Sequence, residues 1–423
     1  MIDSMRRVLP AAAITAAALF AEHAAAQQCY ECLNRCFSFA PPGAEVDRME
    51  TSLNLRSNSL TVTGDIRWRA RIADSPDDAP YNGSDQNTTR ARIQLDYNVN
   101  EWASAFVEFN FSEVWAGSEP YSDAQPFQND PDGLASRENF NGVSQAYMQL
   151  DNAFGFEERI RIGRSYYFLG NGLVLGSCDY LQYPGSFTGI WISRSFGQFD
   201  VELFAFDNYG PLQNQIAGGG ERYAGATTRW NIEEGGAFET LDAYYLAGTG
   251  DGDNEQRADD DWVGVEAAGW LPADIRWEAQ FANRSVDGGD DVSGYRAMIE
   301  HSYDEPIFGF IHGVSFTHTG AEGPLHINPA DFNAAGLLHQ YGGPWRSDLT
   351  TNQLALKFSP GADINCTLAF LTLDRGDGIP QQGEFEVDLL ASKEVRQGFH
   401  VGLGYAIDDE ERQVGFGQAT LYF

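Results

Sequence analysis

The sequence predicts an all-β fold, a transmembrane antiparallel up-and-down β-barrel of about 18 strands, and three observations support this prediction. Apolar and charged residues alternate with a period of two in segment after segment. Short turns and longer connections follow one another in regular order along the chain. After residue 26, no apolar run approaches the ~18 residues that a membrane-spanning helix needs.

Composition and charge restrict the class of protein further. The chain has 423 residues and carries 27 Lys and Arg against 61 Asp and Glu, a formal net charge of −34. Hydrophobic residues make up 43% and aromatic residues 13%, which is too much for a disordered chain. Because so acidic a chain repels phosphate backbones, we expect no nucleic-acid partner.

The first 26 residues have the pattern of a cleavable signal peptide. Arg6 and Arg7 precede an apolar stretch over residues 8–20, and three alanines at 24–26 supply the small residues of a cleavage site. We therefore predict an exported mature chain that begins at Gln27 and reaches the cell outer membrane.

Residues 27–58 are predicted to form a periplasmic N-terminal extension, whose apolar residues within 46–53 favour a short helix. Cys29, Cys32 and Cys36 cluster there. In an oxidising compartment, one local disulfide among them is the expected outcome. A metal site would lack a fourth ligand nearby, and a redox CxxC would lack its usual surroundings, so both remain weaker alternatives.

The strand prediction rests on alternation such as that in residues 66–72, where Arg67, Arg69 and Arg71 are separated by apolar residues. A strand places these arginines on one face and the apolar residues on the other. We expect 18 strands, at 59–73, 88–98, 103–115, 142–150, 159–167, 186–196, 199–209, 221–232, 238–249, 261–271, 275–285, 293–303, 308–319, 350–359, 365–374, 384–394, 399–408 and 413–423.

Connection lengths favour a membrane barrel over a soluble sandwich. Short turns are expected near 98–102, 197–198, 272–274, 304–306, 360–362 and 397–398, with long connections at 74–87, 116–141, 168–185, 250–260 and 320–349. In lipid, an open sheet edge costs several kcal/mol per unpaired group, so the sheet of residues 59–423 must close. Eighteen strands enclose a water-filled lumen, as in the outer-membrane porin type, and the sequence leaves open whether 116–141 or 320–349 folds into it.

If apolar faces meet lipid, the charged faces line the lumen. The residues predicted to line the pore are Arg67, Arg69, Arg71, Arg90, Arg92, Arg159, Arg161, Arg164, Arg276, Arg296, Lys357, Glu108 and Glu278. The basic residues crowd the early strands and the last third is more acidic, which predicts a field across the pore. Arginine suits carboxylates because its planar fork binds two oxygens. The alternative is that arginines and acids pair across strands and only make the wall rigid.

Other chemistry receives little support. Asp251, Asp253 and Glu255 alternate with small residues and form a weak candidate Ca²⁺ site, with solvated charge as the alternative. No other cofactor is expected. No histidine stands in a motif with a nucleophile, so we expect no enzyme.

Several motifs within about 90–205 resemble the alginate export porin family. They are Thr89-Arg90-Ala91-Arg92, Phe106-Val107-Glu108 with Val114-Trp115, Gln145-Ala146-Tyr147, Arg161-Ile162-Gly163-Arg164, the run from Leu169 to Gly176, and Ser186-Phe187-Thr188-Gly189. Gly185, Thr188 and Glu113 depart from the residues usual in that family.

The resemblance implies an 18-stranded outer-membrane barrel with an arginine-lined pore that passes an anionic polysaccharide. By motif, Arg90, Arg92, Arg161 and Arg164 match the family's basic positions. We therefore expect a passive channel for anionic or polar saccharides or other small solutes, with outer-membrane lipid around it and an undetermined oligomeric state. The alternatives are a general diffusion porin with little selectivity and a structural protein that anchors the envelope.

Overall fold

The computed structural model describes residues 51–55, 58–74, 86–117, 140–170, 172–177, 185–208, 221–248, 260–286, 289–323, 325, 327, 349–361, 363–375 and 384–423. Several predicted features lie outside these residues, namely the signal peptide, the disulfide candidates Cys29, Cys32 and Cys36, and the calcium candidates Asp251, Asp253 and Glu255.

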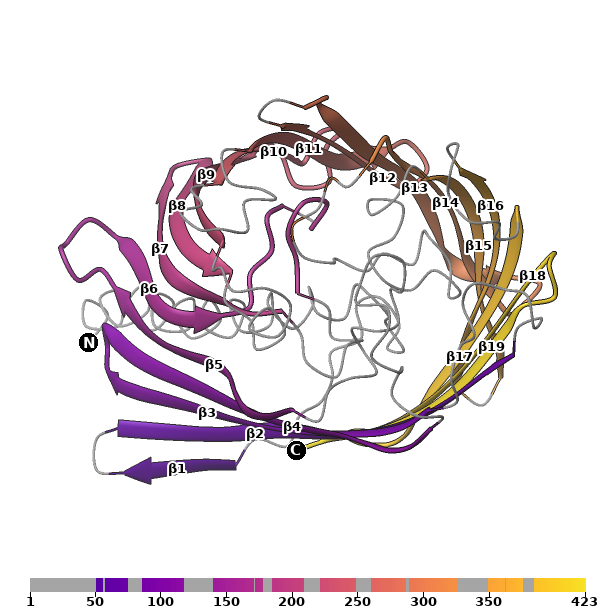
Figure 1. Ribbon diagram of the computed structural model, residues 1–423, viewed down its shortest axis with the longest axis horizontal. Helices are drawn as coiled ribbons and strands as arrows, with labels where there is room; N and C mark the ends of the chain where they lie inside the picture. The colour runs from indigo at the N-terminus through magenta and orange to yellow at the C-terminus, as the bar shows by residue number, and fades with distance from the viewer. Residues whose placement is uncertain are drawn as a thin grey trace, which may run out of the picture.

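The described chain forms a closed antiparallel barrel. Each strand from β2 to β18 pairs with the next, and β19 pairs back with β2, so 18 strands form the ring in Figure 1. The strands are β1 (Thr51–Leu55), β2 (Asn58–Asp74), β3 (Gln86–Asn100), β4 (Ala103–Gly117), β5 (Phe140–Asp151), β6 (Glu158–Ser165), β7 (Phe187–Phe196), β8 (Phe199–Asn208), β9 (Glu221–Asn231), β10 (Thr240–Gly248), β11 (Asp261–Leu271), β12 (Ile275–Ser285), β13 (Val292–Ile307), β14 (Ile311–Ala321), β15 (Leu349–Gly361), β16 (Ile364–Arg375), β17 (Phe385–Arg396), β18 (Phe399–Asp408) and β19 (Gln413–Tyr422). The predicted fold class is confirmed, and β11, β12 and β18 have the predicted bounds.

Side-chain exposure alternates along the strands in the sense that a membrane barrel requires. On β2, the side chains of Ile66 and Trp68 are 45% and 47% exposed, whereas Arg67 and Arg69 are 2% and 6% exposed. β10 repeats the pattern, with exposed Leu241 beside buried Asp242. Apolar residues therefore face outward, where lipid replaces water, and polar residues face the interior.

The barrel closes along one edge of β2, which two strands share end to end. β19 pairs with β2 from Asp65 to Asp74, and β1 pairs with its first residues, from Asn58 to Val62. Between them Phe423 exchanges two backbone hydrogen bonds with Gly64, of 2.8 and 3.0 Å. β3 occupies the other edge of β2. The expected helix over 46–53 is wrong from residue 51 onward, because the free edge of β2 supplies backbone partners that local apolar spacing does not reveal.

One predicted turn is also wrong. Residues 304–306 belong to the end of β13, and the chain reverses at 308–310 instead. Phe308 and Gly309 have positive φ angles of 54° and 76° there. Pro306 is tolerated because the register shifts between Ser302 and Ile307, so no ladder hydrogen bond is needed at the proline.

The connections differ between the two ends of the barrel. At one end the strands join through short connections, such as 101–102, 197–198 and 397–398, and at the other through longer ones, such as 75–85 and 118–139.

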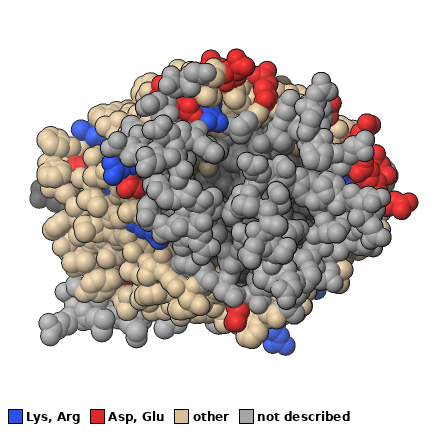
Figure 2. All heavy atoms as spheres, in the orientation of Figure 1, with Lys and Arg blue, Asp and Glu red and all other residues tan. Residues whose placement is uncertain are grey.

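On the face shown in Figure 2, acidic side chains gather along the upper and right margins. Within the described part of the chain, no helix is long and apolar enough to cross a membrane.

Candidate functional site

The first two strands of the ring present arginines to the barrel interior. Arg67 on β2 lies directly opposite Arg90 on β3, and Arg92 lies opposite Asp65. Arg90 and Arg92 are 1% and 0% exposed, while Ile93 beside them is 38% exposed on the outer face. Arg71 occupies a later position of the same parity on β2, opposite Phe416 of β19.

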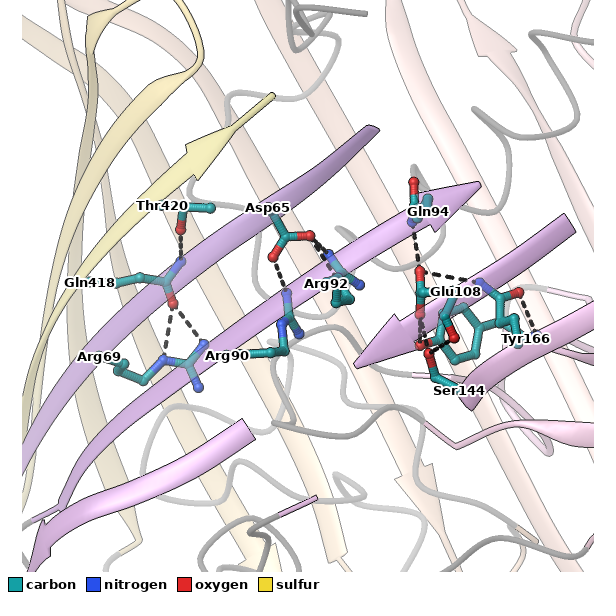
Figure 3. Close-up of polar contacts among 11 residues, drawn as sticks. Asp65, Arg69, Arg90, Arg92, Gln94, Glu108, Ser144, Tyr166, Gln418 and Thr420 are labelled. Atoms are coloured by element: carbon teal, nitrogen blue, oxygen red, sulfur yellow. Dashed lines mark hydrogen bonds and ion pairs between the residues drawn. The ribbon is translucent and has the colours of Figure 1, made fainter. Parts of the chain in front are cut away.

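Acid and amide partners hold several of these arginines. Asp65 accepts hydrogen bonds from Arg90 Nη2 at 3.3 Å and from Arg92 Nε at 2.6 Å (Figure 3). The Gln418 side-chain oxygen accepts two bonds from Arg69, at 3.0 and 2.7 Å. The alternative in which arginines pair across strands therefore describes this part of the wall well, although two cations share one carboxylate at Asp65.

Arg161 on β6 has a different environment. Its Nη2 donates to the neutral amide oxygen of Gln149 at 3.4 Å, and its guanidinium lies 4.7 Å from the centre of the Tyr147 ring. Tyr147 in turn stacks on Phe106 at 5.1 Å, with an interplanar angle of 21°. Among the described residues no carboxylate forms an ion pair with Arg161, whereas Arg159 pairs with Asp151 at 2.8 Å.

Arg164 lies on the other face of the same strand. Arg161 is paired across the ladder with Gln149, which is buried, while Arg164 is paired with Thr188, which is exposed. Its Nε donates to the Thr188 hydroxyl at 3.3 Å on the outer side of the wall. Gly163, with φ 132°, separates Ile162 from Arg164. The prediction that Arg164 lines the pore is therefore wrong, because the strand places Arg161 and Arg164 on opposite faces.

Glu108 on β4 is a fully buried carboxylate that anchors the segment after β6. It accepts hydrogen bonds from Gln94, Ser144, Gln145 and the Tyr166 hydroxyl (Figure 3). Burial raises the pKa of Tyr166 well above its usual value, and the neighbouring Glu108 charge raises that pKa further. The phenol therefore stays protonated and donates to Glu108.

From Tyr166 the chain turns into the barrel. Figure 1 shows this magenta segment leaving the wall after β6 and entering the ring. We call the described residues 166–170 and 172–177 the lumen loop. Leu169 and Leu175 form a bridge within it, and Gly172 donates its N–H to the Leu169 carbonyl at 3.0 Å. The loop is thus a compact hairpin-like turn.

The lumen loop packs against the inner faces of β7 to β14 and forms an apolar cluster with them. Inward aromatic side chains of five successive strands, β7 to β11, take part. The buried members of the cluster are Leu169, Leu173, Val174, Leu175, Phe187, Trp191, Phe204, Phe206, Tyr223, Tyr244, Leu246, Trp262, Ala282, Ala321, Leu325 and Ile327. One side of the lumen is therefore filled by apolar side chains, and β2 and β3 lie across the ring from β10 and β11 in Figure 1.

Polar contacts fix the loop in this position. Ile327 donates its N–H to the Val174 carbonyl at 2.8 Å, and the Tyr167 hydroxyl donates to Glu202 at 2.8 Å. Gly170, with φ +59°, lies directly under Glu266, and a Cβ there would collide with the Glu266 carboxylate. The positive φ favours glycine at this position.

Sequence reasoning missed the lumen loop. It treated 168–185 as an outer connection, although the run of leucines and valine from 169 to 175 is unusually apolar for solvent. That run is the signal that could have identified an inward-folded segment, since a solvated loop gains nothing from several large apolar side chains.

The remaining residues predicted to line the pore lie on β12, β13 and β15, and they form ion pairs. Glu278 on β12 pairs with Arg276 at 3.1 Å and with Arg296 at 3.4 Å. Lys357 on β15 pairs with Glu300 at 2.7 Å. Within the described ranges, no group of three or more His, Cys, Asp or Glu residues could hold a metal ion.

Removing the Tyr166 hydroxyl is expected to loosen the lumen loop. Tyr166→Phe deletes one hydrogen bond to a buried carboxylate, a loss of about 1–3 kcal/mol of local stability. We expect more open-channel current noise in single-channel recordings. Tyr245→Phe is the matched control, because it deletes a phenol bond to Asp261 on the outer face. Equal noise in the two variants would contradict the anchoring role of Tyr166.

Comparison with solved structures finds the same fold in bacterial porins. OpdK from Pseudomonas aeruginosa, solved with vanillate, matches with a TM-score of 0.59 and 12% identity over 87% of this chain and 99% of that chain. A BenF-like porin from Pseudomonas fluorescens Pf-5 gives 0.61 and 9%, over 87% and 98% of the two chains. OccAB4 from Acinetobacter baumannii gives 0.58 and 10%, over 86% and 97%.

No protein-family model and no curated protein sequence matches the chain. At 9–12% identity the three structures share the fold rather than a demonstrated substrate. The closed ring of 18 strands, its apolar exterior and its charged interior are those of an outer-membrane porin barrel.

Proposed function

We propose that this barrel is a passive outer-membrane channel for small anionic and polar solutes, with carboxylates as the preferred class. The observation that carries the proposal is Arg161, an inward arginine with a neutral hydrogen-bond partner, beside the stacked rings of Tyr147 and Phe106. An arginine fork binds a carboxylate through two oxygens, and a ring next to it accepts the flat body of the solute.

The surrounding wall adds to the attraction. Among the side chains that the structure describes on β2 to β6, the interior carries six arginines and four acids, an excess of two positive charges. They are Arg67, Arg69, Arg90, Arg92, Arg159 and Arg161 against Asp65, Asp96, Glu108 and Asp151. In a chain that is strongly acidic overall, this local excess of positive charge attracts anions to this side of the lumen.

The lumen loop supports small solutes over a polymer. It takes up part of the lumen beside β7 to β14, which narrows the space available to a solute. The vanillate with which OpdK was solved is an aromatic carboxylate of the size that one arginine and two rings accommodate. Export of an alginate-like polysaccharide is the alternative, and longer chains would then pass as well as short ones.

Planar-bilayer recording tests the proposal. Under a KCl gradient we expect a reversal potential with the sign of an anion-selective channel. We also expect benzoate or vanillate to enter liposomes faster than neutral sugars do. A strong preference for cations would contradict the proposed selectivity for anions. Faster transport of oligouronates than of monomeric carboxylates would favour the polymer alternative, and absence of conductance would favour an anchoring protein.

A further inference from the structure

A turn at the short-connection end of the barrel holds two large apolar side chains in the open. Phe154 and Phe156, in the connection 152–157, are 70% and 61% exposed. The carboxylate of Glu158 accepts the backbone N–H groups of both residues, at 2.6 and 3.0 Å. Asn152 Oδ1 accepts the N–H of Glu157 at 2.9 Å. These bonds define the turn, so the two rings are held outward by a fixed backbone.

The aromatic surface continues onto the neighbouring strands. Phe196 at the end of β7 lies opposite Phe199 of β8, and Phe199 lies opposite Trp230 of β9. The last two rings stack at 5.7 Å with an interplanar angle of 21°. All three side chains are exposed on the outer wall. A row of outward aromatic residues at one end of a barrel marks the level of the lipid headgroups.

Arg194 lies within this row and on the same outer face. Ile190 and Ile192, at the same parity on β7, are 37% and 38% exposed, whereas Trp191 between them is 4% exposed and faces inward. The guanidinium of Arg194 is 4.5 Å from the centre of the Phe196 ring and 6.0 Å from that of Phe156. The two rings bracket a cation on the lipid side of the wall.

No described residue gives Arg194 a hydrogen bond or an ion pair, and its Nε is buried without a partner. Glu158 is its neighbour across the ladder, but the Glu158 oxygens accept the two backbone N–H groups of the turn. A cation on the outer face at headgroup depth costs little, and besides the Glu158 carboxylate across the ladder the anions available there are lipid phosphates. Arginine binds phosphate through its fork.

We propose that Arg194, bracketed by Phe156 and Phe196, binds the phosphate of an anionic phospholipid at the short-connection end of the barrel. The rings contact the acyl and glycerol part of the lipid, while the guanidinium contacts the headgroup. The site lies on the outer wall, so it is independent of which solute passes through the lumen.

The test measures lipid retention on the intact barrel. Wild-type protein is reconstituted in nanodiscs of phosphatidylcholine and phosphatidylglycerol, released into detergent, and its bound lipids are counted by native mass spectrometry. We expect phosphatidylglycerol enrichment, and Arg194→Gln should reduce it about fivefold. Arg194→Lys should keep most of it, and Phe156→Leu should keep only part.

Arg222→Gln is the matched control, since Arg222 lies at the opposite end of the barrel, pairs with Asp207, and its side chain is 62% exposed. Unchanged enrichment in Arg194→Gln, or an equal loss in Arg222→Gln, would overturn the proposal. A competition experiment adds inorganic phosphate or phosphatidylglycerol vesicles to the protein with its retained lipid. Equal displacement by the two would also overturn the proposal, because the site would then bind an anion rather than a lipid. Heat-modifiable migration on gels confirms that each variant is folded.

Discussion

Replacing Arg161 by glutamate is expected to lower the chloride-over-potassium permeability ratio of the channel about three- to tenfold. The substitution changes the lumen charge by two units at a position where the hydrogen-bond partner is a neutral amide. It also removes the cation that lies over Tyr147, so transport of aromatic carboxylates should fall more than that of chloride. Reversal potentials in planar bilayers and liposome flux of benzoate provide the two measurements.

Arg164→Glu is the control for that experiment, three residues along the same strand. It changes the net charge of the protein by the same amount, but Arg164 lies on the outer face with Thr188. We expect its permeability ratio to match the wild type. An equal shift in both variants would mean that selectivity follows net charge rather than the lumen wall.

Salt dependence separates a direct electrostatic effect from a structural one. The shift caused by Arg161→Glu should be largest in dilute salt, where the Debye length is about 30 Å, and should nearly vanish at 1 M, where it is about 3 Å. Arg90 and Arg92 are less informative targets, because removing them leaves Asp65 buried without its two partners.

The wall of the barrel was predictable from sequence because its signal is local. Alternation along 66–72 identifies which face of β2 meets lipid, and Ile66 and Arg67 indeed fall on opposite faces. The lengths of the connections give the number and direction of strands in the same way. Each of these inferences uses neighbours within one strand or turn, so no knowledge of distant contacts is required.

The interior was predictable only in part, because it depends on contacts between distant segments. The charge pattern along the strands predicts that Arg90 and Arg161 both face the lumen and does not distinguish between them. Only the strand pairing of the structure shows that Arg90 bonds to Asp65 while Arg161 bonds to Gln149. Arg164 is three residues from Arg161, so strand alternation by itself separates their faces, and the motif resemblance that joined them was the weaker guide. The inward course of the lumen loop depends on partners on several strands, which no local pattern contains.

Placing a charge in the apolar cluster is expected to release the lumen loop. Leu173 is fully buried between the loop and the inner wall, and Leu173→Asp would bury a carboxylate there without a partner. The cost of burying that charge exceeds the roughly 2–5 kcal/mol that a buried leucine contributes, so the loop should leave the wall. The 18 strands are held by their own backbone ladder, and the barrel should remain folded.

Release of the loop should raise single-channel conductance, because the lumen beside β7 to β14 would fill with water and ions. It should also weaken discrimination between carboxylates and neutral sugars, since solutes would no longer be directed past Arg161. Leu173→Met keeps the volume and apolar character of the side chain and should leave both quantities near their wild-type values. Unchanged conductance in Leu173→Asp, with the barrel folded, would show that the loop does not restrict the route, and the preference for small solutes would lose its physical basis.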